Sequence, residues 1–428
     1  MNALSLFLPC AAGVESWLLS EVQTLLGADA HDARAHRAGV TLRASWRDVL
    51  RLNLHSRLAQ RVLVQLRQAR YAQEQDLYEC ARDVAWESWF TPRQSFKIDL
   101  TAQHSPLKSL NFAALRIKDG LVDRFRDKAG MRPDVDTHRP DVRVFAQLTA
   151  ESLTLYIDTS GEPLFKRGWR EDKGDAPLKE TLAAAMLAAC GWSQGEAGSE
   201  GLVAQGVPLY DPCCGSGTIA IEAAQIACRM APGLQRRFGL ERLLPFQPHV
   251  WQGLQQEARA QQCAPRAPVF GSDVAFRMVD FAQRNAQRAG VAHAVQLRGG
   301  DALQRMPPCE TAGVMLVNPP YGERIETAGV AGTTRRGTLR VAASAEGAPA
   351  RAVGAREQTQ VADGGDFFVQ LASHWKKHYP GWTAWMLTPE LKLPSRMRFK
   401  ESRRIPMWNG PIECRLFRFD LRAGSMRS

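Results

Sequence analysis

The chain has 428 residues, of which 45% are hydrophobic and 23% charged, and its formal net charge is +11. This length allows two or three domains, and the composition excludes a wholly disordered or collagen-like chain. A basic surplus of this size suits a polyanionic partner such as a nucleic acid.

Two further features bear on where the protein works. No apolar run approaches the ~18–20 residues that span a bilayer, so we expect no membrane segment. The nine cysteines are scattered and include no CxxC pair. We therefore expect reduced thiols in a cytoplasm, with neither a disulfide framework nor a bound metal.

The first 160 residues predict two small α+β modules, residues 1–60 and 61–160. Alternating apolar residues predict the strands, and apolar residues three or four apart predict the helices. The predicted strands are 4–8, 39–42, 62–66, 95–100, 142–148 and 153–157. The predicted helices are 14–26, 46–58, 76–89 and 111–125, the last capped by Asn111.

The pattern changes in residues 165–428, where strands alternate with helices. Such alternation predicts βα units and a mainly parallel sheet, hence an α/β domain. The predicted strands are 207–210, 268–273, 295–297 and 313–317, and the predicted helices are 178–190, 217–229 and 275–289. Residues 329–360 lack aromatic side chains and are rich in Ala, Gly and Arg, so we expect a disordered insertion there.

A glycine-rich loop follows the strand 207–210 and opens a helix. Glycines let a backbone approach a ligand closely, and a helix N-terminus offers free N–H groups. The loop also fits the dinucleotide pattern GxGxxA, but the acidic residue expected about 20 positions later is missing. The candidate cofactor-binding residues in this loop are Asp211, Cys213, Gly215, Ser216, Gly217 and Thr218.

Acidic residues also end the next two predicted strands. Asp273 is placed to bind two ribose hydroxyls, and Asp301 to accept a hydrogen bond from an adenine amine. Either residue alone is more often a helix cap or a loop residue. Three acids at successive strand ends, with Asp211 beside the glycine loop, favour a cationic ligand. S-adenosylmethionine, with its sulfonium and ammonium groups, is the expected cofactor.

The segment Asn318-Pro319-Pro320-Tyr321 directly follows the strand 313–317. The Asn318 amide oxygen and the Pro319 carbonyl supply two acceptors for an exocyclic NH₂ group, and Tyr321 supplies a stacking face. The alternative is a proline-rich turn without a function. We take the four residues as catalytic, with Asn318 also beside the cofactor.

On these motifs the sequence resembles class I RNA methyltransferases that carry an N-terminal THUMP domain, especially bacterial 23S ribosomal RNA guanine-N2-methyltransferases. The likeness covers nearly the whole chain and includes DPCCGSGT, NPPYGER, KRGWR and APLKETLA. It implies a ferredoxin-like module, a THUMP domain and a Rossmann-like domain with a seven-stranded sheet. It also implies methyl transfer to guanine N2 in 23S rRNA. Longer fused relatives have a second methyltransferase half after this domain, and we expect none in this chain.

Basic residues indicate where RNA is expected to bind. Phosphates need cations, and bases stack on Trp or Arg. A solvated charged face is the alternative for either cluster. The candidate RNA-binding residues are Lys166, Arg167, Trp169, Arg170, Arg403 and Arg404.

Three other functions stay open at this stage. A tRNA guanine-N2-methyltransferase and an adenine-N6 nucleic-acid methyltransferase use similar motifs. A non-catalytic RNA-binding or ribosome-assembly factor is the alternative outside enzymes. The sequence does not give the target nucleotide or the oligomeric state.

Overall fold

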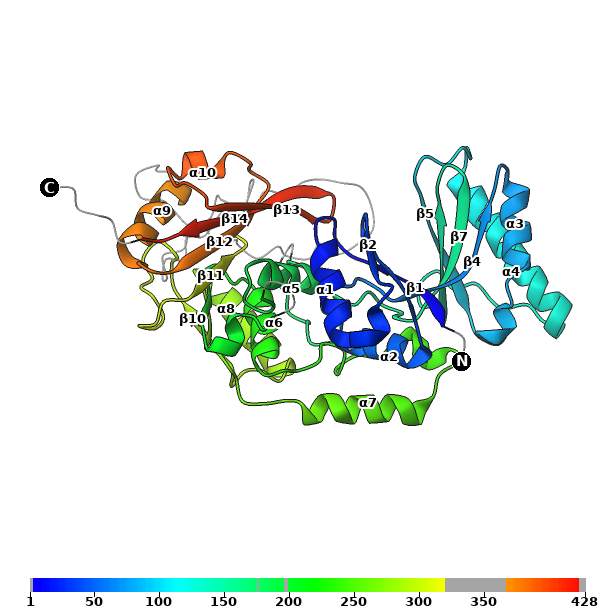
Figure 1. Cartoon of the computed structure of the whole chain (residues 1–428), viewed down its shortest axis with the longest axis horizontal. Coiled ribbons are helices and arrows are strands. Elements are labelled where there is room, and N and C mark those ends of the chain that lie inside the picture. Colours follow the sequence, from blue (N-terminus) through cyan, green and yellow to red (C-terminus); the bar gives the residue numbers. More distant parts are fainter. Residues whose placement is uncertain (1–2, 175–176, 196–198, 320–366, 423–428) are drawn as a thin grey trace, which may run out of the picture.

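The computed structural model describes residues 3–174, 177–195, 199–319 and 367–422. Two seven-stranded sheets lie at the two ends of the long axis, with the first helices between them (Figure 1). One continuous cluster of buried apolar side chains runs from Leu6 in the first sheet to Leu416 in the second. The two sheets are therefore parts of one packed body.

The first sheet joins both predicted N-terminal modules, because β1 pairs directly with β4 through Leu6 and Val64. Its strand order is β2-β3-β1-β4-β7-β6-β5, and neighbours are antiparallel except β5 and β6. All six strands predicted in this region are present, and β2 is additional. The bounds are β1 Leu4–Pro9, β2 Arg34–His36, β3 Gly39–Ala44, β4 Leu63–Arg70, β5 Phe96–Ala102, β6 Val142–Leu148 and β7 Ser152–Asp158.

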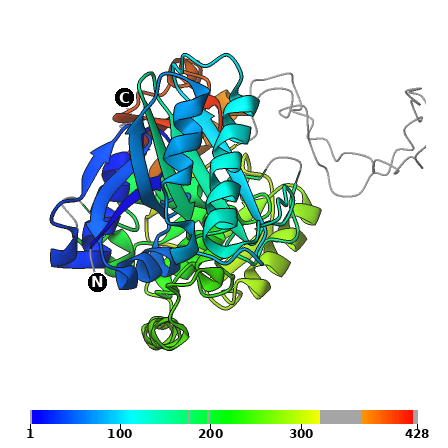
Figure 2. The same ribbon diagram turned by 90° about the vertical axis from the view of Figure 1, so that its right-hand side faces the viewer.

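Four helices cover this sheet, and α3 and α4 lie side by side over its outer part (Figure 2). Their bounds are α1 Glu15–Leu26, α2 Trp46–His55, α3 Glu74–Arg82 and α4 Leu110–Ala129.

Two details of the helix predictions are wrong. The predicted helix 76–89 ends at Arg82, because Trp86 turns back and its indole N–H donates to the Ala81 carbonyl at 2.7 Å. Asn111 does not cap α4. The Ser109 hydroxyl does, since it accepts a hydrogen bond from the Phe112 N–H at 3.2 Å.

The second sheet has the order β10-β9-β8-β11-β12-β14-β13, with β14 antiparallel to both of its neighbours. The predicted seven-stranded, mixed and mostly parallel sheet is confirmed. Both faces are covered: Leu316 packs toward the N-terminal modules, whereas Met315 and Val317 pack on the α9 side. The strands are β8 Leu209–Asp211, β9 Val269–Asp273, β10 Val295–Gly299, β11 Val314–Val317, β12 Thr383–Thr388, β13 Arg403–Asn409 and β14 Ile412–Asp420.

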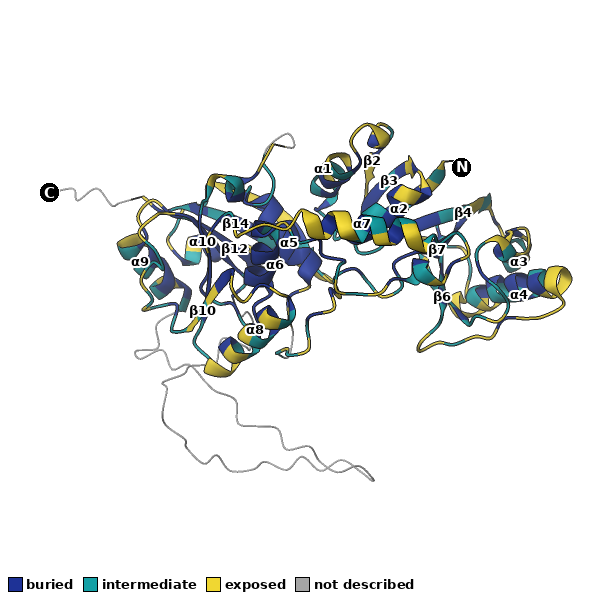
Figure 3. Cartoon of the chain, turned by 90° about the horizontal axis from the view of Figure 1, so that it is seen from below, coloured by how far each residue is buried: buried dark blue, intermediate teal, exposed yellow. Residues whose placement is uncertain are grey.

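The helices of this domain include three that were not predicted from the sequence: α7, α9 and α10. α7 buries Trp251, Leu254 and Ala258 and exposes its other side to solvent (Figure 3). The bounds are α5 Glu180–Ala189, α6 Thr218–Ala227, α7 Pro248–Ala260, α8 Phe276–Arg288, α9 Phe367–His378 and α10 Leu393–Arg396. Within the described ranges, none of the helices has the length and apolar character needed to cross a bilayer.

A buried ion network joins the N-terminal modules to the second domain. Glu222 of α6 is fully buried and accepts from Arg57 at 3.0 Å and from Arg167 at 3.0 Å. Arg57 follows α2, and Arg167 lies in the segment between the two domains. Burial alone would raise the pKa of Glu222, but the two guanidinium groups hold it below its ordinary value. Glu222 is therefore ionised, and it links three parts of the chain.

Replacing this carboxylate tests its structural role. Glu222→Gln keeps the side-chain volume but leaves Arg57 and Arg167 buried without an anion, so the free energy of unfolding should fall by ~3–5 kcal/mol. Asp83→Asn is the control, because its pair with Arg67 is solvent-exposed on both sides. This control should lose less than ~1 kcal/mol. Urea unfolding measures both changes, and equal losses would contradict the proposed role of Glu222.

Candidate active site

Four parallel strands bring the predicted site residues to one edge of the second sheet. β8, β9, β10 and β11 run in the same direction. Their carboxyl ends therefore lead into Asp211, Asp273, Asp301 and Asn318, which share this edge. In open α/β sheets, ligands bind at the carboxyl edge, so the sequence prediction of a common site is physically sound.

Asp211 ends β8 and is only 1% exposed. Its Oδ1 accepts a hydrogen bond from the Cys213 N–H at 3.1 Å. Burial raises the pKa of Asp211 to about 8, and the nearby charge of Asp273 adds to this rise. Asp211 is thus an acid that becomes ionised most readily when a cation arrives beside it.

A hydrogen bond to the carboxylate at the end of β9 holds the glycine loop. The Gly215 N–H donates to Asp273 Oδ2 at 2.8 Å. Both loop glycines have positive φ, +52° for Gly215 and +88° for Gly217. A Cβ at Gly215 would meet open space, whereas one at Gly217 would lie 3.0 Å from Ala282 of α8. Gly215 therefore leaves room at the ligand side, and Gly217 allows the loop to pack on α8.

Ser216 and Thr218 face the interdomain segment. Arg170 donates to the Ser216 hydroxyl at 2.9 Å and to the Thr218 hydroxyl at 2.8 Å. Glu180 neutralises the same guanidinium at 2.7 Å. The hydroxyls of this loop thus have partners in the protein, and so do the backbone N–H groups of Cys213, Cys214, Gly215 and Gly217.

The other predicted cofactor residues lie close by. Cys213 is half-buried, and burial raises the pKa of its thiol well above the ordinary value, so the thiol is neutral. Asp273 also accepts from the Ala275 N–H at 3.0 Å, and Asp301 accepts from the Leu303 N–H at 2.9 Å. These bonds fix both carboxylates at the ends of their strands.

Asn318 follows β11 and carries an unusual acceptor. Its Oδ1 atom is buried and has no hydrogen-bond partner among the described residues. Pro319 next to it is buried. Pro320, Tyr321 and the predicted insertion 329–360 lie outside the described residues. The structure thus contains one buried amide oxygen at the sheet edge that needs a donor.

The predicted RNA-binding residues divide into exposed and buried ones. Lys166 is exposed and pairs with Glu162, and Arg403 and Arg404 are exposed on β13. Arg167 and Trp169 are each 1% exposed, so RNA cannot reach them in this structure and their predicted role is corrected.

Arg170 is corrected in the same way. Its side chain is 12% exposed and points into the glycine loop. Arg167 thus links the two domains, Trp169 packs in the buried core, and Arg170 supports the glycine loop, so none of the three presents a basic face to RNA.

Sequence reasoning missed three residues of the site. Asn285 of α8 is fully buried and donates to the Ser216 carbonyl at 3.0 Å and to the Asp172 carbonyl at 2.8 Å. Asp172 binds Arg284 and Arg288. Phe276 is 61% exposed and lies against Gly299 at the end of β10. A large apolar residue three positions after Asp273 was the available signal.

Three family profiles match consecutive parts of the chain. The RlmL ferredoxin-like domain matches residues 5–63, the THUMP domain residues 71–158, and the RMKL-like methyltransferase domain residues 167–353.

Curated relatives are named ribosomal RNA large subunit methyltransferase K/L. The Shewanella loihica protein is 36% identical over 395 residues, covering 91% of this chain and 49% of that protein. The Psychromonas ingrahamii protein is 32% identical over 419 residues, covering 96% of this chain and 49% of that protein. The chain thus spans about half the length of the curated relatives it matches.

Solved structures share the whole fold at low identity. A possible methylase from Clostridium difficile 630 has a TM-score of 0.78 at 23% identity, covering 99% of this chain and 100% of that one. SMU.472, a candidate methyltransferase complexed with SAH, has a TM-score of 0.77 at 22% identity with the same coverage. The fold predicted from the resemblance is confirmed, and consecutive parts of the chain match the models of an RlmL ferredoxin-like domain, a THUMP domain and an RMKL-like methyltransferase domain.

Proposed function

We propose that this chain transfers a methyl group from S-adenosylmethionine to an exocyclic base amine in ribosomal RNA, with guanine N2 of 23S rRNA as the target. The name shared by the curated relatives supports a large-subunit ribosomal RNA substrate. The THUMP profile and the basic surplus support an RNA partner. Work on ribosomal RNA would place the protein in the cytoplasm.

The observation that carries this proposal is the buried Asn318 Oδ1 atom, which has no hydrogen-bond partner among residues 3–174, 177–195, 199–319 and 367–422. A buried acceptor without a donor costs ~1–3 kcal/mol, so such an atom calls for a ligand that donates. An exocyclic NH₂ group is a donor of the right kind. We assign the backbone carbonyl of Pro319 as the second acceptor for this NH₂ group. Proline has no backbone N–H, so this residue offers only an acceptor.

The strand-end acids fit the cofactor. Asp211 lies beside the glycine loop and is suited to the cofactor ammonium, because a buried carboxylate is stabilised by an opposite charge. Asp273 accepts the N–H groups of Gly215 and Ala275, which hold its carboxylate at the strand end, where it would accept from ribose hydroxyls. Asp301 and the exposed ring of Phe276 would flank the adenine.

When bound, the cofactor supplies an electrophilic methyl group on its sulfonium. The residues that would hold the cofactor are Asp211, Asp273 and Asp301, and the chemistry it would supply is methylation of the target nitrogen. The methylated amine, now cationic, loses a proton to water. Asn318 and Pro319 contribute by orienting the nitrogen lone pair, and such positioning accounts for a large share of the rate.

Methyl transfer to defined nucleic acids tests the proposal. The full chain with radiolabelled S-adenosylmethionine should label 23S rRNA from a strain lacking the corresponding gene, and nucleoside mass spectrometry should identify N2-methylguanosine. Label in tRNA, or in adenine, would replace the proposed target with one of the two rival substrates. Cofactor binding without label in any nucleic acid would favour a non-catalytic RNA-binding factor.

The Asn318 assignment predicts a defect in chemistry alone. Asn318→Ala removes one of two acceptors for the amine, so the single-turnover rate should fall by at least ~10²-fold with RNA and cofactor saturating. Calorimetry should give nearly unchanged cofactor affinity, because the proposed cofactor contacts lie on the acids. Asn318→Asp keeps an acceptor and should lose less. A normal rate for Asn318→Ala would reduce the segment to a structural turn.

The raised pKa of Asp211 predicts proton release on cofactor binding. At pH 7 a carboxyl with a pKa of about 8 is mostly protonated, and a cation favours its ionised form. Binding should therefore release close to one proton, and affinity should rise with pH until the pH passes the pKa.

Calorimetry in buffers of different ionisation enthalpy measures this proton. Asp211→Asn is the control, since it keeps the shape of the side chain but cannot ionise. The variant should bind the cofactor more weakly and lose the proton release. The same release from wild type and variant would assign the proton to another group.

A further inference from the structure

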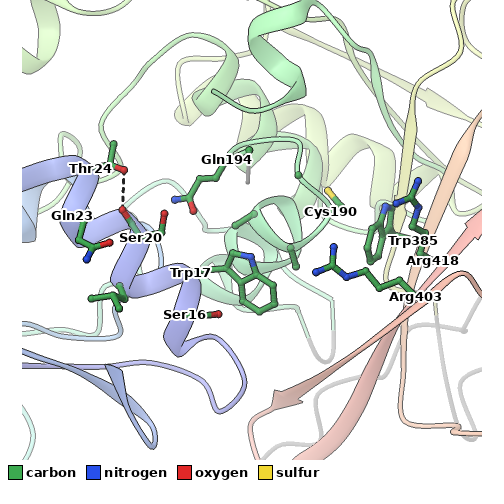
Figure 4. Close-up of a pocket in the computed structure, with 15 residues that line it drawn as sticks. Ser16, Trp17, Ser20, Gln23, Thr24, Cys190, Gln194, Trp385, Arg403 and Arg418 are labelled. Carbon is green, nitrogen blue, oxygen red and sulfur yellow. Dashed lines mark hydrogen bonds between the residues drawn. The ribbon is translucent and has the colours of Figure 1, made fainter. Parts of the chain in front are cut away.

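A second binding groove lies away from the strand-end acids, at the junction of the two sheets. It has a volume of about 690 Å³ and is enclosed by α1, the end of α5 and the last strands of the second sheet (Figure 4). This volume falls within the ~300–1,000 Å³ typical of small-ligand sites. None of the strand-end residues assigned to methyl transfer lines it.

Three side chains form a row across the floor of this groove. Trp385 of β12 pairs with Arg418 of β14, and Arg418 pairs with Arg403 of β13. Directly paired residues of neighbouring strands lie on the same face of a sheet, so all three side chains share one face. Arg404, the next residue on β13, faces the opposite side because side chains alternate along a strand.

The row is positively charged. Arg403 is exposed, and no acidic group of the described residues lies within ion-pair distance of it. Arg418 donates to Asp420 at 2.8 Å, and its guanidinium lies 5.8 Å from the centre of the Trp385 ring. Asp420 thus neutralises Arg418, and the charge of Arg403 leaves the row net positive for an anion.

The opposite wall supplies an aromatic face and amides. Trp17 of α1 is half-buried, and its indole points into the groove toward Arg403 (Figure 4). Gln194 also lines the groove, and its Oε1 atom is buried without a hydrogen-bond partner among the described residues. Cations, an aromatic face and an amide acceptor together suit single-stranded nucleic acid, whose phosphates, bases and base amines need these groups.

We propose that this groove binds a single-stranded stretch of the RNA substrate that flanks the target base. Arg403 and Arg418 would contact phosphates, Trp17 would stack on a base, and Gln194 would accept from a base amine. This assignment rests on the proposed function for its substrate.

The sheet geometry allows one RNA to occupy both places. β13 is three strands from β11, which leads to Asn318, and neighbouring strands lie ~4.8 Å apart. The lateral separation is then roughly 14 Å, which a few nucleotides span. RNA held in the groove would thus limit where the target base can lie.

Fluorescence anisotropy with the full chain and a labelled oligouridylate tests the groove. Arg403→Glu should raise the dissociation constant about tenfold or more, because it replaces a phosphate contact by a repulsion. It should also reduce the slope of log affinity against log salt by ~1 or more. Arg259→Glu on the exposed side of α7 makes the same charge change away from the groove and should bind within twofold of wild type.

A cross-linking measurement keeps the test independent of folding defects. With 4-thiouridine in the oligonucleotide, mass spectrometry should find the cross-link in the wild-type peptide that contains Trp17. Equal weakening by both glutamate variants, or cross-links confined to peptides outside the groove, would overturn the proposal. Displacement of the oligonucleotide by uridine monophosphate at matched nucleotide concentration would indicate a mononucleotide site and also overturn it.

Failure of the groove and failure of the proposed function give different results. If the groove assignment alone is wrong, wild type and Arg403→Glu methylate rRNA equally well. If the proposed function is wrong, wild type itself transfers no methyl group to rRNA, whatever the oligonucleotide binding shows.

Discussion

The structure depends on one buried carboxylate, Glu222, and on the two arginines that neutralise it. Arg57 comes from the first module, Arg167 from the segment between the domains, and Glu222 from the helix that follows the glycine loop. An ionised group without partners is costly to bury, so all three parts must be docked at once. A second domain separated from residues 1–160 would keep Glu222 but lose Arg57. The stability of this domain therefore depends on its contact with the first module.

The same interdomain segment also supports the cofactor loop from behind. Arg170 holds the hydroxyls of Ser216 and Thr218, while Asn285 binds the Ser216 carbonyl and the Asp172 carbonyl. The chain that leaves the THUMP domain is thus part of the wall of the proposed cofactor site. A displacement of this segment relative to α6 would break the contacts of Arg170 with the glycine loop. The interdomain segment therefore contacts both the first module, through Arg167, and the glycine loop, through Arg170.

The sequence predicted the strand-end acids because their signal is local: an apolar strand followed at once by a polar residue. Topology then brings those ends together without further information. The sequence-based prediction of RNA contacts failed at Arg167, Trp169 and Arg170, because a run of basic and aromatic residues is also typical of an RNA-binding surface. Their burial depends on Glu222 and Glu180, and the Arg167 partner lies 55 residues away. The groove could not be predicted either, because it also depends on residues that are distant in the sequence. Only the register of β12, β14 and β13 aligns Trp385, Arg418 and Arg403.

Three buried amide oxygens have no hydrogen-bond partner among the described residues, and two of them, on Asn318 and Gln194, lie at the two proposed binding places. Folding normally satisfies buried acceptors, and each exception requires a reason. One lies at the carboxyl edge beside the strand-end acids, and the other lies in the positively charged groove. The carboxyl edge is built within the second domain, whereas the groove combines α1 of the first module with α5, β12, β13 and β14. A donor-rich, anionic, single-stranded ligand that occupies both would relieve both acceptors at once, and RNA has these properties.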